Sequence, residues 1–186
     1  MRTSTVTFRL ACAASAAACA LAFAVPAQAA PGYRSLTAAQ LKNVVGAVAF
    51  PSSSKTEVLA TGRSEELGVE SICGAAFPAG GAGYHLLENA DGSDRAVIII
   101  NQTARVSPAA YAKAVRTGTC NAGVSRIRPK GLPAGAVAVN SHDSGIPFVA
   151  VVPRGRVVLL VRERAISAMV RQATSATAAY DRLART

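Results

Sequence analysis

The chain has 186 residues, a formal net charge of +10 and only 5% aromatic residues. Few aromatic side chains lie between the basic residues, and the chain starts like an exported protein, so nucleic acid is an unfavourable partner. The length that remains after an N-terminal leader suits one domain with its own core, which argues against a multidomain protein.

The first 29 residues have the three parts of a secretory signal peptide. Arg2 and Arg9 form a basic start, residues 10–25 are uncharged and rich in alanine, and the small-residue sequence Pro-Ala-Gln-Ala ends at Ala29. We expect cleavage after Ala29, which leaves residues 30–186 as a single domain, secreted or retained in the cell wall. The apolar run is shorter than the ~20 residues of a spanning helix, so no transmembrane segment is expected after cleavage.

The next elements are a helix and an ambiguous stretch. Thr37 and Gln40 have the spacing of a capping box, and apolar residues then recur at helical spacing, which predicts a helix over about 37–48. Residues 55–83 are rich in glycine toward their end and predict a loop, with a strand near 69–73.

A hairpin and a second helix follow. Residues 84–89 and 95–102 flank a turn-forming Asp-Gly segment, and residues 97–100 are apolar on both faces, which predicts a central strand covered on both sides. Ser107 and Pro108 are a favoured N-cap and first helical residue, so a helix is expected over about 108–117.

The last third predicts strands and a long helix. Strands are expected at about 124–127, 135–141, 147–152 and 156–162, the last two joined by a turn at Pro153–Gly155. A helix over about 165–184 has a sheet-facing stripe of Ile166, Met169, Val170, Ala173, Thr177, Tyr180 and Leu183. Strand runs joined by short turns favour an α+β fold, an antiparallel sheet with helices packed on it.

Two of the four cysteines belong to the mature domain. Cys12 and Cys19 lie in the leader, and Cys73 and Cys120 remain, so we expect one disulfide between them, as is usual in an exported protein. A lipoprotein anchored through Cys19 is the alternative form, although three alanines precede this cysteine in place of the usual Leu three residues before.

Charge is unevenly distributed. Residues 30–94 have a net charge of −3, and residues 95–186 have a net charge of +11. A solvated basic surface is one interpretation, and affinity for an anionic envelope polymer or lipid head groups is the other. The residues expected to converge on an anion are Arg126, Arg128, Lys130, Arg154 and Arg156, of which Lys130, Arg154 and Arg156 lie in predicted turns or at their edges.

No complete catalytic constellation is present. His142 lies beside Asp143 and Ser144, but neighbours on a strand point apart, so a turn is the preferred interpretation and the protein is expected not to be an enzyme. The alternative is a small secreted hydrolase that uses His142 or His85. No paired spacing of metal ligands exists, and the glycines at 80–83 lack the Lys-Ser/Thr of a phosphate loop, so neither a metal nor a cofactor is expected.

Three segments together resemble a known family. They are Ser35–Gly46 (Ser-Leu-Thr-Ala-Ala-Gln-Leu-Lys-Asn-Val-Val-Gly), the Ser-Pro-Ala-Ala-Tyr helix start followed by Cys120, and Pro153–Val161 before the last helix. This pattern is similar to the extracellular sensor domains of mycobacterial PknH-type kinases and related secreted actinobacterial proteins. The resemblance implies an α+β domain with a cleft and a non-catalytic sensor or binding module, and it transfers no ligand and no individual site residue. A small apolar ligand held in a cleft between sheet and helix is the alternative to an anionic polymer. The kinase domains have two disulfides, whereas one pair is available here, and neither a kinase nor a membrane helix is present.

Overall fold

The computed structural model describes residues 32–46, 71–76, 82–88, 95–101, 107–142 and 145–185, and for 82–88 and 95–101 the description is limited to the backbone. The predicted signal peptide with Cys19, the hairpin turn at 90–94, and the pair Asp143 and Ser144 lie outside the described residues.

The described elements follow the expected order with one added small hairpin. The three helices are α1 (Ala38–Gly46), α2 (Pro108–Thr117) and α3 (Ile166–Ala184). The strands are β1 (Ser71–Ile72), β2 (Ala75–Ala76), β3 (Ala82–Glu88), β4 (Arg95–Asn101), β5 (Val124–Ile127), β6 (Val137–Ser141), β7 (Phe148–Arg154) and β8 (Val157–Glu163).

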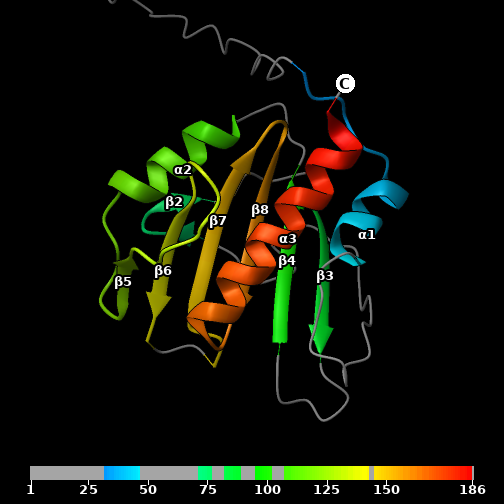
Figure 1. The fold of residues 1–186 in the computed structure, drawn as a ribbon. Helices are drawn as coiled ribbons and strands as arrows, with labels where there is room; N and C mark the ends of the chain where they lie inside the picture. The colour runs from blue at the N-terminus through cyan, green and yellow to red at the C-terminus, as the bar shows by residue number, and fades with distance from the viewer. Residues whose placement is uncertain are drawn as a thin grey trace, which may run out of the picture.

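Six strands form one antiparallel sheet in the order β3-β4-β8-β7-β6-β5, and among the described strands β1 pairs only with β2. The α+β prediction is therefore confirmed, and β4 has an interior position as its sequence indicated (Figure 1). The pairing of β4 with β8, in which Ile99 faces Leu160, joins the early hairpin to the late strands.

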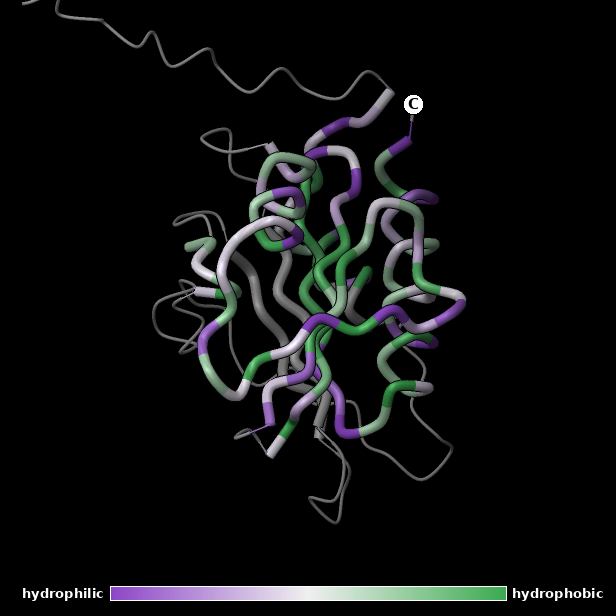
Figure 2. The backbone as a smooth tube through the Cα atoms, turned by 90° about the vertical axis from the view of Figure 1, so that its left-hand side faces the viewer, coloured by the Kyte–Doolittle hydropathy of each residue, from purple (hydrophilic) through white to green (hydrophobic). Residues whose placement is uncertain are grey.

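Helices cover both faces of this sheet. We call the face under α1 and α3 the front face, and the face under α2 and the β1–β2 hairpin the back face. Figure 2 looks along the sheet and shows helices on both sides, with the hydrophobic colour concentrated in the strands between them. Alternation in the strands divides the core, with Ala150, Val152 and Leu159 buried in front, and Val149, Val151 and Leu160 buried behind.

Local sequence signals explain where the helices begin. In α1, the backbone N–H of Thr37 donates to Gln40 Oε1 at 2.9 Å, and that of Gln40 donates to Thr37 Oγ1 at 3.3 Å, which is the predicted capping box. In α2, Ser107 Oγ accepts from the backbone N–H of Ala110 at 3.1 Å, as expected of an N-cap.

Three details differ from the sequence-based expectations. Ile166 was expected to face the sheet, but it is the first residue of α3 and is 40% exposed. The β7–β8 turn lies at Gly155–Arg156, because Arg154 still pairs with Val157. Gly83 belongs to β3 and not to a loop. Among the helices of the described segments, none has the length and apolar character to cross a bilayer.

Candidate functional site

The back face has a cavity of about 210 Å³, which we call the back-face cavity. Its floor is apolar and consists of Val139 from β6, Val149 from β7 and Leu160 from β8. These side chains share one face because Val139 pairs with Val149 and each strand alternates. Ile72 and Val124 are further apolar lining residues. The polar lining residues are Ser71, Asn121, Ser141 and Arg162.

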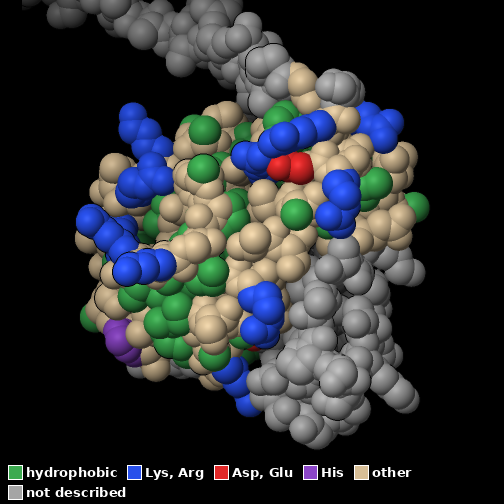
Figure 3. Space-filling model, viewed as in Figure 1, with side chains coloured by type: hydrophobic (Ala, Val, Ile, Leu, Met, Phe, Trp, Pro, Cys, Tyr) green, Lys and Arg blue, Asp and Glu red, His purple; other side chains and the backbone are tan. Residues whose placement is uncertain are grey.

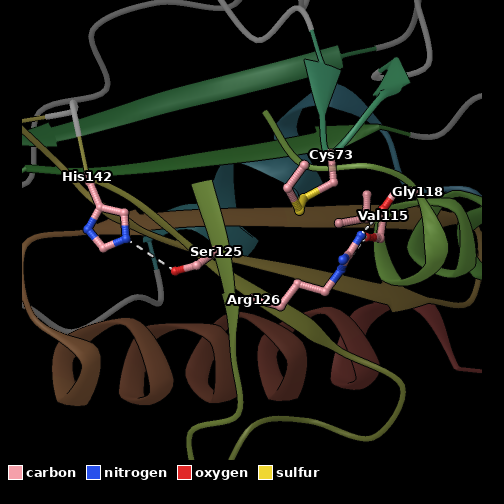
Figure 4. Close-up of a disulfide and its surroundings, with 7 residues drawn as sticks. Cys73, Val115, Gly118, Ser125, Arg126 and His142 are labelled. Atoms are coloured by element: carbon pink, nitrogen blue, oxygen red, sulfur yellow. Dashed lines mark hydrogen bonds between the residues drawn. A yellow bond between two sulfur atoms is a disulfide. The ribbon is translucent and has the colours of Figure 1, made fainter. Parts of the chain in front are cut away.

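A disulfide holds the wall of this cavity in place. Cys73 and Cys120 are bonded, as predicted, and Cys73 is itself a lining residue (Figure 4). This bond joins the turn of the β1–β2 hairpin to the segment that follows α2. The hairpin has two residues in each strand and pairs with none of the other described strands, so the disulfide is the cross-link that ties it to the end of α2.

Gly118 makes the close approach at this junction possible. A Cβ atom at Gly118 would overlap the carbonyl oxygen of Cys73 and would lie 2.8 Å from that of Ala114. Only glycine permits the backbone of the hairpin turn to lie directly against the end of α2.

Arg126 forms hydrogen bonds at the same junction. Its Nε and Nη2 atoms donate to the carbonyl oxygen of Val115 at 3.0 and 2.9 Å, and Nη2 also donates to that of Gly118 (Figure 4). The last carbonyls of a helix lack partners within the helix and carry partial negative charge. Arg126 therefore stabilises the end of α2.

Arg162 gives the back-face cavity its positive charge. It follows Val161 near the end of β8, and its position in the strand puts it on the same face as Leu160. Burial lowers the pKa of Arg162, because the guanidinium loses part of its hydration. A guanidinium in the lining can donate charge-assisted hydrogen bonds to an anionic group of a ligand.

A second concave site lies at the β5 edge of the sheet, and we call it the edge hollow. It has a volume of about 460 Å³ between β5, β6 and the loop at 128–136. Arg116, Arg126 and Arg128 line it together with apolar residues that include Ile127 and Leu132. The structure thus brings Arg126 and Arg128 together, with Lys130 exposed in the same loop.

Arg154 and Arg156 lie at a different site, the β7–β8 turn. Arg154 donates to Asp181 through Nε at 2.8 Å and through Nη2 at 2.5 Å, so its charge is engaged by a carboxylate of α3. The backbone N–H of Arg156 donates to the hydroxyl of Tyr180 at 3.2 Å. The five expected anion-binding residues are therefore divided between two places.

Asp181 joins the first described segment to the last helix. It accepts from Tyr33 Oη at 3.0 Å and pairs with Arg185 at 3.0 Å, and the rings of Tyr33 and Tyr180 stack with centroids 5.8 Å apart. Burial opposes ionisation of Asp181, but hydrogen bonds from Arg154 and Tyr33 and the nearby positive charges outweigh it. The pKa of Asp181 consequently lies below its usual value. We call these contacts the Asp181 junction.

His142 contacts a serine on the exposed edge of the sheet. Its Nε2 lies 3.3 Å from Ser125 Oγ, and its Nδ1 lies 3.5 Å from Asn140 Nδ2 (Figure 4). The Ser125 hydroxyl can both donate to and accept from an imidazole nitrogen, so the two side chains are within hydrogen-bond distance of each other. The side chain of His85 lies outside the described residues. Within the part of the chain described, no three His, Cys, Asp or Glu residues gather as metal ligands would.

Sequence reasoning missed the roles of Arg162 and Arg116. The sequence signal for Arg162 was an arginine at a core-facing position of an otherwise apolar strand. Burying a charge there costs free energy unless the charge is paired. For Arg116, the only sequence signal was its position in the last turn of a predicted helix. A cation at that position also interacts favourably with the helix dipole.

Comparisons of the chain with family models, curated proteins and solved structures found no significant match.

Proposed function

We propose that this chain is a secreted, non-catalytic, sensor-like binding module of the cell envelope that holds a small amphipathic anion in the back-face cavity. The observation that supports this most directly is the combination of an apolar floor with Arg162 in one cavity of about 210 Å³. Ligand sites are typically apolar with a few polar groups that fix orientation. The resemblance to PknH-type sensor domains supports the same class of function.

The dimensions of the back-face cavity restrict the ligand. Drug-sized molecules occupy roughly 300–1,000 Å³, so a ligand of this cavity is smaller. Its hydrocarbon part would contact Val139, Val149 and Leu160, and a carboxylate or phosphate would pair with Arg162. A short-chain fatty acid has this chemistry.

Titration with octanoate, with octanol as the uncharged comparison, tests the proposal by calorimetry or by NMR shifts of β6–β8 amides. Octanoate should bind more tightly than octanol, and Arg162→Met should weaken octanoate at least tenfold, because charge-assisted bonds contribute roughly 1.5–3 kcal/mol. Val139→Leu should weaken both ligands by reducing the cavity volume. Arg171→Met, on exposed α3 surface, is the matched control and should bind like the wild type. Equal octanoate affinity in wild type and Arg162→Met would disprove the proposal.

Export is part of the same proposal. The basic start, apolar middle and small-residue site of residues 1–29 support secretion, and a disulfide suits an oxidising compartment. Mass spectrometry of protein from culture supernatant should find Ala30 as the first residue. An acylated Cys19 would identify the lipoprotein form, and an intact Met1 would contradict export.

A hydrolase is the second candidate, and the contact between His142 and Ser125 is the observation that favours it. Both residues are exposed on β5 and at the end of β6, and neither lines the back-face cavity. An ester or peptide hydrolysis that disappears in His142→Ala and in Ser125→Ala would support this candidate over the binding module.

A further inference from the structure

We propose that the protein docks onto membranes that contain anionic phospholipids, through a surface made of the edge hollow and the apolar residues beside it. We call this the docking surface. Its apolar residues lie on the front face, and its arginines lie at the β5 edge and at the end of α2. The linings of the edge hollow and of the back-face cavity share no residue. The proposal is therefore separate from the function proposed above.

Apolar side chains form one component of the docking surface. Ile127, Leu132 and Phe148 pack against the front-face core but remain partly exposed. Ile166 is 40% exposed, and no other large hydrophobic side chain within the described ranges is so exposed. Figure 3 shows an apolar area over β6 and the start of α3, with basic side chains at its borders. Such residues can enter the boundary between head groups and acyl chains.

Three guanidinium groups form the other component. Arg116, Arg126 and Arg128 line the edge hollow, and its lining includes no carboxylate. Two of the three are held in position, because Arg116 Nη2 donates to the carbonyl oxygen of Gly135 at 2.9 Å and Arg126 is bound to the end of α2. Guanidinium charges that are held in place lose little conformational entropy when an anionic head group binds beside them.

Few negative charges compete for these cations. Segments 107–142 and 145–185 contain five and seven Lys and Arg residues, respectively, but only two acidic residues, Glu163 and Asp181. Glu163 is buried, with 2% of its surface exposed, and Asp181 is engaged by Arg154 and Arg185. The surface potential around the edge hollow is consequently positive, which attracts anionic lipid head groups.

The apolar component favours a lipid over an anionic polymer. A polyanion would bind through charge alone, and that attraction is screened by salt over about 8 Å at physiological ionic strength. A phospholipid offers both phosphate for the arginines and hydrocarbon for Ile127, Leu132 and Ile166. Adjacent apolar and basic residues match both parts of that molecule.

Vesicle co-sedimentation of the mature protein tests this. Wild type should bind vesicles of phosphatidylcholine with 30% phosphatidylglycerol and not those of phosphatidylcholine alone. The double variant Arg116→Gln/Arg128→Gln should bind about 20-fold more weakly, since each basic residue near an anionic surface contributes roughly a fivefold gain. Ile166→Ser should weaken binding several-fold, most clearly at 300 mM NaCl, where the apolar contribution remains. Arg182→Gln, an exposed cation in the last turn of α3, is the control and should change binding by less than twofold.

Several results would overturn the proposal. One is equal binding to both kinds of vesicle, and another is normal binding by the double variant when circular dichroism shows it folded. Binding to isolated cell-wall polymer that Ile166→Ser does not alter would assign the surface to a polyanion. If 10 mM inorganic phosphate occupies the edge hollow but the protein does not bind vesicles, the edge hollow is a site for the ion alone. Arg162→Met should leave vesicle binding unchanged, and Arg128→Gln should leave octanoate binding unchanged, so the two proposals fail independently.

Discussion

The two faces of the sheet are covered in different ways. On the front face, α3 provides 19 residues of continuous helix, and buried residues from Met169 to Ala184 fill the layer beneath it. On the back face, the ten-residue α2 and the β1–β2 hairpin share the cover, and a disulfide joins them. The back-face cavity lies under the cover formed by α2 and the β1–β2 hairpin. A face covered by short, separately attached pieces can leave room for a ligand, whereas a long helix excludes it.

The largest effect is expected from removal of the disulfide. In Cys73→Ala/Cys120→Ala, the unfolding free energy should fall by about 4 kcal/mol, because the bond closes a long loop with a sequence separation of 47. Hydrogen exchange should show that amides of α2 lose more protection than those of α3. Reduction of the wild-type disulfide should reproduce the effect. An equal loss on both faces would contradict the distinction between them.

The next largest effect is expected from one added methyl group at the point where the β1–β2 hairpin meets the end of α2. Gly118→Ala should lower the unfolding free energy by about 3 kcal/mol, since the new Cβ would overlap the backbone of Cys73 and backbone cannot move aside easily. Denaturant titration measures the change. Gly145→Ala is the control, because no atom lies within 4 Å of a Cβ there, and its stability should be unchanged. A neutral Gly118→Ala would show that the hairpin is not held closely against α2.

The smallest of the three effects on stability is expected at the Asp181 junction, on the front-face side of the sheet. Asp181→Asn should cost about 2 kcal/mol, between the values for exposed and buried ion pairs. The folded protein holds the pKa of Asp181 below its usual value, so the stabilisation is complete above about pH 4 and disappears as pH falls through the folded pKa. Wild type should therefore approach the stability of Asp181→Asn in acid, while the exposed-site control Arg182→Gln keeps the wild-type pH dependence. A constant difference between wild type and Asp181→Asn down to pH 2 would be inconsistent with this.

Local chemistry made much of the fold predictable. The capping box of Thr37 and Gln40 and the N-cap Ser107 act within one turn, so the sequence alone indicates where α1 and α2 begin. The pairing of β4 with β8 joins residues about sixty positions apart and depends on packing that no short motif records. The wrong orientation of Ile166 has the same origin, since helical spacing does not reveal where the sheet beneath a helix ends.

The candidate sites were less predictable than the fold. The sequence indicated Arg126 and Arg154 as candidate anion-binding residues but not the acceptors within their reach. Arg126 binds helix carbonyls and Arg154 binds Asp181, and both acceptors come from other parts of the chain. The wall of the back-face cavity was indicated only through Cys73 and Cys120, because a cavity is a property of three packed elements and not of a motif.

The Asp181 junction also sets an order of events while the protein is made. The bond between Tyr33 and Asp181 spans 148 residues, so it cannot form until the ribosome has added the end of α3. At ~5–20 residues per second, the Tyr33 segment waits about 7–30 s for its partners. Contacts between the first and last described segments of the domain therefore form only after nearly the whole chain has been made.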